Sequence, residues 1–201
     1  MYKLTDIMIQ NLEKDLKTFH SLFSGGRCEA WQLEELIVRA IKSDHNKSES
    51  VKWTGRGHDV DKDIRITEEK DKVNDIQIKS GKIKKSNMTV SGHRTGRFKE
   101  DLDKITEFLN SNKYDTFLIP YREEENKLGK RFIYQIFYAD SNIFKIDNVW
   151  EPKIGKKGGK TFFTQNSQGV KMSLRLSMSW QIWYEIPLSI LVDSTREIIC
   201  N

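Results

Sequence analysis

The stretch that most constrains the fold runs from Gly55 to Gly81 and reads GRGHDVDKDIRITEEKDKVNDIQIKSG. Its two halves, VDKDIRIT and VNDIQIKS, read as strands: an apolar alternation follows Asp63 in the first, and Val73, Ile76 and Ile78 supply apolar packing in the second. Side chains two residues apart on a strand point to the same face. A hairpin that joins the two strands would therefore place Asp63 beside Gln77 and Lys79.

A carboxylate, an amide oxygen and an ammonium would converge at this point. Hard divalent cations prefer oxygen ligands, and a nearby ammonium stabilises the charge of a phosphodiester under attack. The stretch therefore predicts a site that binds a divalent cation and acts on a phosphate ester. Asp61 is the alternative to Asp63, since it would lie on the same strand face. We favour Asp63 because Ile64 and Ile66 follow it in strand alternation.

The order Asp63, a short gap, then Gln77-x-Lys79 resembles the PD-(D/E)XK nuclease superfamily, which includes most type II restriction endonucleases. Gln77 stands where the second acid usually lies, a variant that some active members also have, and Lys62 stands where the name has proline. The resemblance implies that Asp63, Gln77 and the backbone carbonyl of Ile78 hold the metal. It also implies that Lys79 orients the attacking water or stabilises the phosphate.

The order of the expected elements agrees with this resemblance. Apolar residues at helical spacing predict helices over residues 3–23, 29–43 and 95–112, and further strands are expected at 50–54 and 114–120. Residues 29–121 then read helix, three strands, helix, strand, which matches the αβββαβ core of the resembled superfamily. The first helix of that core often carries a glutamate that reaches toward the metal, and Glu34 fits its register. A solvated surface acid is the alternative for Glu34.

We therefore expect an α/β fold with a restriction-endonuclease-like core, in which helices flank a mixed central sheet. The 201 residues suit a single domain. Within it, residues 1–28 would hold an N-terminal helix, 29–121 the catalytic core, and 122–201 a β-rich extension for DNA recognition or dimerisation. Alternation in the extension predicts strands at 131–139, 171–179 and 180–186, with 141–146 continuing the sheet.

The charge of the chain is modest overall, because 34 basic residues stand against 29 acidic ones, a net charge of +5. The clustering of basic residues along the chain is therefore more informative about partners than the net charge. Phosphate contacts are expected from a turn, a basic run after the site and a glycine-rich loop, with solvated surface residues as the alternative. The residues concerned are Arg56, Lys82, Lys84, Lys85, Lys156, Lys157 and Lys160.

The glycine-rich loop does not match a nucleotide-binding P-loop. That motif needs a glycine five residues before the Gly of its Gly-Lys-Thr, and Ile154 stands there before Gly159. No nucleotide cofactor is expected. Asn and Gln can pair with adenine edges, which makes Gln165, Asn166 and Gln168 candidate base readers.

The function expected from these features is that of a type II restriction enzyme, which cleaves double-stranded DNA with Mg²⁺, or with Mn²⁺ in its place. Symmetric cleavage of a duplex needs two active sites, so a homodimer is expected, although some small family members cut as monomers. An Mrr-like, repair or junction-resolving nuclease is the second enzyme reading. A catalytically inactive DNA-binding module is the alternative class, and Gln77 keeps it open.

The two cysteines, Cys28 and Cys200, are too few for a disulfide framework and have no metal-binding spacing. No apolar run approaches the ~20 residues that span a bilayer. A cytoplasmic location without membrane attachment is therefore expected.

Overall fold

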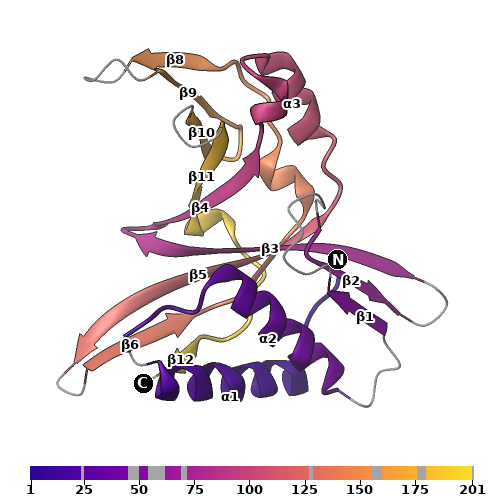
Figure 1. Ribbon diagram of the computed structural model, residues 1–201, viewed down its shortest axis with the longest axis vertical. Coiled ribbons are helices and arrows are strands. Elements are labelled where there is room, and N and C mark those ends of the chain that lie inside the picture. Colours follow the sequence, from indigo (N-terminus) through magenta and orange to yellow (C-terminus); the bar gives the residue numbers. More distant parts are fainter. Residues whose placement is uncertain are drawn as a thin grey trace. The chain divides into compact units, whose positions relative to one another are not determined.

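The computed structural model describes residues 1–23, 25–44, 50–53, 62–68, 72–126, 129–154, 160–175 and 180–200. These residues form a mixed α/β protein with strands of mixed polarity (Figure 1), as the sequence predicts at this level. The α-helices in the described part are α1 (Asp6–Leu22), α2 (Ala30–Lys42) and α3 (Leu102–Asn110). None of them is long and apolar enough to cross a membrane.

Contacts divide the chain into two compact units. Unit 1 comprises residues 1–80, 114–139 and 193–201, and unit 2 comprises residues 81–113 and 140–192. Each unit draws on segments that are distant in sequence, so neither coincides with the expected ranges 29–121 and 122–201. The single-domain organisation stays a prediction.

The strands of unit 1 are adjacent in the order β12-β6-β5-β3-β2-β1, and β7 also pairs with β5. β2 is antiparallel to β1 and to β3, and β5 is antiparallel to β6 and β7. The neighbours β3 and β5 run in the same direction (Figure 1), which gives the sheet its mixed polarity. Their bounds are β1 (Ser50–Trp53), β2 (Ile64–Thr67), β3 (Val73–Lys84), β5 (Asp115–Asn126), β6 (Gly129–Tyr134), β7 (Phe137–Ala139) and β12 (Ile198–Cys200).

The core of unit 1 lies between this sheet and the helices α1 and α2. Strand alternation sends Ile64, Ile76 and Ile78 to the same buried cluster as Leu33 and Ile37 of α2. α1 begins at a capping box in which Thr5 accepts a hydrogen bond from the backbone of Met8. The apolar residues of these strands are buried in the core. The polar residues between them are therefore the ones available to form a functional site.

Unit 2 is an antiparallel sheet in which the last residues of β3 pair with β4, followed by β11, β10, β9 and β8. α3 and a 3-10 helix at Ser141–Phe144 cover one face, where Phe108 contacts His93 and Phe144 contacts Tyr184. The remaining strands are β4 (Asn87–Arg94), β8 (Glu151–Ile154), β9 (Lys160–Gln165), β10 (Lys171–Arg175) and β11 (Gln181–Pro187). Short 3-10 helices also occur at Gly96–Phe98 and Leu188–Ile190.

Three local expectations were wrong. β4 was not expected, so the order between α2 and β5 has one strand more than αβββαβ. Residues 141–146 were expected to continue the sheet, but Asp140 caps a 3-10 helix by accepting from the Asn142 backbone N–H at 2.8 Å. The basic, glycine-rich segment 151–161 was expected as a loop, yet β8 and the start of β9 pair at its two ends, and residues 155–159 between them lie outside the described part.

Candidate active site

The pairing of β2 with β3 brings Asp63 to the strand that carries Gln77 and Lys79. Ile64 lies opposite Ile76 in this pair, and the Asp63 backbone N–H donates to the Ile76 carbonyl at 3.0 Å. The Asp63 carboxylate Oδ2 accepts a hydrogen bond from the Ile78 N–H at 2.6 Å. The carboxylate therefore lies at the edge of β3 beside Ile78, the residue between Gln77 and Lys79 in the sequence.

The backbone carbonyl of Ile78 points to the same edge. In a strand, the N–H and C=O of one residue face the same neighbouring strand. Because the Ile78 N–H points at Asp63, its carbonyl oxygen is directed to the side of β3 on which Asp63 lies. The resemblance assigns this carbonyl to the metal, and its direction suits that assignment.

Glu34 approaches the site from α2. One of its oxygens accepts a hydrogen bond from the Trp53 indole N–H at 3.2 Å, which joins α2 to β1. Burial, together with the negative charge of Asp63, raises the pKa of Glu34 to about 7, while the Trp53 indole and the Lys79 ammonium act in the opposite direction. Glu34 is therefore not a fully solvated surface acid.

Burial also raises the pKa of Asp63, and the Ile78 N–H and the Lys79 ammonium oppose this rise. Two half-buried carboxylates and one lysine thus influence one another across α2, β2 and β3. Burial and a neighbouring like charge both disfavour ionisation, and a cation between the carboxylates would offset both effects.

These residues fit a hard cation such as Mg²⁺, which is bound by oxygen atoms. Glu34 and Asp63 would offer such an ion carboxylates, and Gln77 and the Ile78 carbonyl would offer neutral oxygens. Within the described ranges no three His, Cys, Asp or Glu side chains are placed to hold a metal together. The Gln77 side chain is only 2% exposed, which restricts its approach to a ligand.

Asp75 shares its strand face with Gln77 and Lys79 but is engaged in ion pairs. Arg65 donates to both of its oxygens at 2.7 Å, and Lys62 lies 3.0 Å from Oδ2. These partners hold the pKa of Asp75 below its usual range. Lys62, which stands where the resembled superfamily has proline, therefore serves an ion pair. Asp75 is an acid on a neighbouring position that can be compared with Asp63.

Trp53 is the residue of this site that the sequence did not indicate. It lies opposite Ile64 in the β1–β2 pair, one position from Asp63 along β2. The expected strand over 50–54 contained the signal, because an aromatic N–H in a half-buried strand normally finds an acceptor.

The expected DNA contacts are dispersed. Lys82 and Lys84 are exposed near the end of β3, and Lys85 is exposed in the following turn. Lys160 is ion-paired to Glu100 at 3.2 Å and lies over the Phe162 ring. Arg56, Asp61, Lys156 and Lys157 lie outside the described residues.

Asn166 was wrongly included among the candidate base readers. Its side chain is 5% exposed, donates to the carbonyls of Ile143 and Lys145 and accepts from the Val170 N–H at 2.9 Å. It therefore holds a turn together. Gln165 and Gln168 are exposed.

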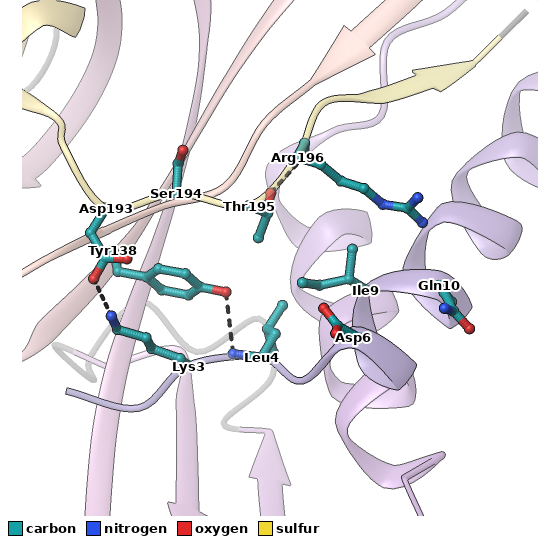
Figure 2. Close-up of a pocket in the computed structure, with 10 residues that line it drawn as sticks. All are labelled: Lys3, Leu4, Asp6, Ile9, Gln10, Tyr138, Asp193, Ser194, Thr195 and Arg196. Atoms are coloured by element: carbon teal, nitrogen blue, oxygen red, sulfur yellow. Dashed lines mark hydrogen bonds and ion pairs between the residues drawn. The ribbon is translucent and has the colours of Figure 1, made fainter.

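A pocket of about 520 Å³ lies elsewhere in unit 1, between the start of α1 and the segment Asp193–Arg196 (Figure 2). Three of its charged residues are already paired, since Lys3 contacts Asp193 at 2.5 Å and Arg196 contacts Glu13 at 2.6 Å. None of the residues proposed for the Asp63 site lines it. The pocket therefore adds no ligand or catalytic group to that site.

Comparison with protein-family models, curated proteins and solved structures finds no match to this chain. Its function is therefore inferred from the geometry and chemistry of its residues.

Proposed function

We propose that the protein is a metal-dependent endonuclease that hydrolyses phosphodiester bonds of double-stranded DNA. The observation that carries this proposal is the Asp63 carboxylate at the Ile78 N–H, in electrostatic reach of Lys79 and Glu34. Such a convergence of acids and an ammonium suits a reaction at a dianionic transition state. Carboxylates that only solvate a surface would not share a half-buried position.

The residues of the site then have three different roles, which are binding the metal, contacting the water or phosphate, and positioning the carboxylates. Asp63, Gln77, the Ile78 carbonyl and Glu34 would hold Mg²⁺. When bound, this ion lowers the pKa of a coordinated water and neutralises phosphate charge. The Lys79 ammonium donates hydrogen bonds to the attacking water or to a phosphate oxygen. The Ile78 N–H and the Trp53 indole keep the two carboxylates in position.

The element order gives partial support to a restriction-endonuclease-like core. α2, β1, β2 and β3 follow one another in unit 1, and β5 lies beside β3. The strand β4 and the helix α3, which belong to unit 2, depart from the expected αβββαβ arrangement. The narrower proposal, a type II restriction enzyme that acts as a homodimer, is therefore tested by the pattern of DNA fragments that the protein produces.

A plasmid digest with Mg²⁺ and with EDTA tests the proposal. A sequence-specific endonuclease gives discrete fragments only with Mg²⁺, and sequencing their ends gives the site. A smear or nicked circles would instead indicate a repair or structure-specific nuclease. Intact plasmid with Mg²⁺ and with Mn²⁺ would contradict the nuclease function.

The second candidate function is a DNA-binding module with an inactive nuclease-like core. The burial of Gln77 favours it, because a side chain that is 2% exposed is poorly placed to exchange ligands. In this case DNA is retarded on a gel, yet no metal supports cleavage.

A further inference from the structure

The sheet of unit 2 has one covered face and one open face. On the covered face, Tyr184, Ile182 and Leu174 are buried against the side of α3 and the 3-10 helix. Residues directly opposite in antiparallel strands point to the same side. The pairing register therefore identifies which side chains share the open face.

Two aromatic residues stand on this open face. Trp183 of β11 lies opposite Ser173 of β10, and Ser173 lies opposite Phe163 of β9. Two strand spacings of roughly 4.8 Å separate the aromatic positions by roughly 10 Å. Phe163 is 39% exposed, so its ring is accessible to a ligand on this face.

Cations surround these aromatics on the same face. The Arg175 guanidinium lies 5.1 Å from the centre of the Trp183 ring, and the Lys153 ammonium lies 5.7 Å from that of Phe163. The register places further lysines on this side. They are Lys82, Lys84 and Lys171.

The acids of this face, within the described residues, are Glu151 and Glu185. Glu185 accepts a hydrogen bond from the Asn87 amide at 2.5 Å. The charge of the face is therefore predominantly positive, although the whole chain has a net charge of only +5.

The face is hollowed at its aromatic centre. A depression of about 160 Å³ is lined by Trp183, Phe163, Lys171 and Arg175, among others. A second hollow of about 450 Å³ shares Phe163 and Lys171 and continues toward Gln165. The Trp183 indole N–H is buried and has no hydrogen-bond partner in the described part of the chain.

We propose that this face binds single-stranded nucleic acid, with bases stacked on Trp183 and Phe163 and phosphates held by Lys171, Arg175 and Lys153. Aromatic platforms beside backbone-tracking cations are the general means of binding single strands. Stacked nucleotides rise about 3.4 Å each. Two rings roughly 10 Å apart would therefore contact bases about three nucleotides apart in a single strand.

Duplex DNA suits this face less well. Its major groove is about 12 Å wide and admits a helix or a two-stranded ribbon. From β4 to β8 the sheet spans four strand spacings, or roughly 19 Å. A sheet of this width is too broad for the major groove, and bases within a duplex are not free to stack on its aromatics.

The inference goes beyond the proposed nuclease function and is tested without it. Fluorescence anisotropy in EDTA would measure the binding of a labelled single-stranded DNA, an RNA of the same sequence and the corresponding duplex to the full chain. We expect the single strands to bind with an affinity that depends on the aromatic residues of this face, and any duplex binding to be independent of them. The DNA and RNA arms identify which single strand is preferred.

Trp183→Ala and Phe163→Ala should each weaken single-strand binding about 5- to 100-fold, the range for loss of one base–aromatic stack. Trp183→Phe should retain most of the affinity. Trp31→Ala and Phe23→Ala remove exposed aromatics of unit 1 and should leave the affinity unchanged within about 2-fold. Thermal melts would verify that each variant is folded, and Phe163→Ala, which loses little buried surface, guards against a misfolded Trp183 variant.

Unchanged single-strand affinity in folded Phe163→Ala and Trp183→Ala would overturn the inference. An equal loss of duplex affinity in these variants would overturn it as well, because bases within a duplex are not free to stack on the two rings. Because EDTA prevents cleavage, neither result depends on whether the Asp63 site is active.

Discussion

The Asp63 site of unit 1 and the open sheet face of unit 2 both gather charged side chains on strands, but under opposite conditions. At the first, half-buried carboxylates repel each other and have raised pKa values. At the second, exposed cations lie beside aromatic rings. Burial strengthens electrostatic effects on a reacting group, whereas exposure lets a long polyanion reach many cations. The difference suggests chemistry in unit 1 and binding in unit 2.

The largest expected effect separates the two regions directly. Lys79→Ala should lower the rate of DNA cleavage about 100-fold or more, because an ammonium that stabilises the transition state is lost. DNA affinity should stay within about 2-fold. Single-turnover cleavage and gel retardation measure the two quantities. Lys52→Ala, which removes an exposed lysine of β1, is the control and should change neither. Loss of both activities in a folded Lys79→Ala protein would indicate a structural role.

The second prediction concerns two cations on the open sheet face of unit 2. Lys171→Ala combined with Arg175→Ala should weaken single-strand binding about 10-fold near 0.1 M salt. The slope of log affinity against log salt should fall by about 1.4, since each phosphate contact contributes about 0.7. Anisotropy titrations over a salt series provide both values. An unchanged slope would show that these cations do not contact phosphate.

An added negative charge should raise the affinity for Mg²⁺ more at the buried site than on the surface. Gln77→Glu adds a carboxylate beside Asp63 and should tighten Mg²⁺ binding in the absence of DNA about 10-fold, because opposite charges attract strongly where water is scarce. Gln10→Glu makes the same change at an exposed position of α1 and should have no effect. Calorimetry measures both affinities, and equal affinities for wild type and Gln77→Glu would remove Gln77 from the metal site.

The smallest expected effect concerns the ion-paired acid of β3. Asp75→Asn should lower the free energy of unfolding by about 1 kcal/mol at pH 7, since charge-assisted hydrogen bonds from Arg65 and Lys62 are weakened.

Because folding lowers the pKa of Asp75, its stabilisation is present above the unfolded-state pKa of about 3.9 and is lost as the pH falls through the folded-state value. Urea unfolding at pH 7 and near pH 3 would measure this. A difference between wild type and Asp75→Asn that stays the same at both pH values would contradict the assignment.

The sequence predicted the elements whose patterns are strong. Alternation over VNDIQIKS placed β3 correctly, and the pairing with β2 brought Asp63 to the Ile78 N–H. β4 escaped notice because its hairpin turn, Lys85-Ser86, has no glycine although Lys85 has a φ of 58°. Strand periodicity indicates which residues share a face of the sheet, but it does not reveal a hairpin turn that contains no glycine.

Side-chain partners were harder to predict than elements. Nothing in the local pattern distinguishes Asp75, held by Arg65 and Lys62, from Asp63, held by a backbone N–H. Asn166 likewise looked like an exposed loop residue until its contacts with Ile143 and Lys145 were seen. These contacts join residues about ten or more positions apart, and they depend on tertiary structure. The open face with Trp183 and Phe163 required the register of β9, β10 and β11.

The most direct measurement compares two isosteric changes on neighbouring strands. Asp63→Asn and Asp75→Asn would be assayed for Mg²⁺-dependent cleavage of plasmid DNA at a temperature where both proteins are folded. We predict that Asp63→Asn abolishes cleavage and that Asp75→Asn cleaves at nearly the wild-type rate. Equal cleavage by both variants, or none by the wild type with Mg²⁺ or Mn²⁺, would contradict the assignment of catalysis to the Asp63 site.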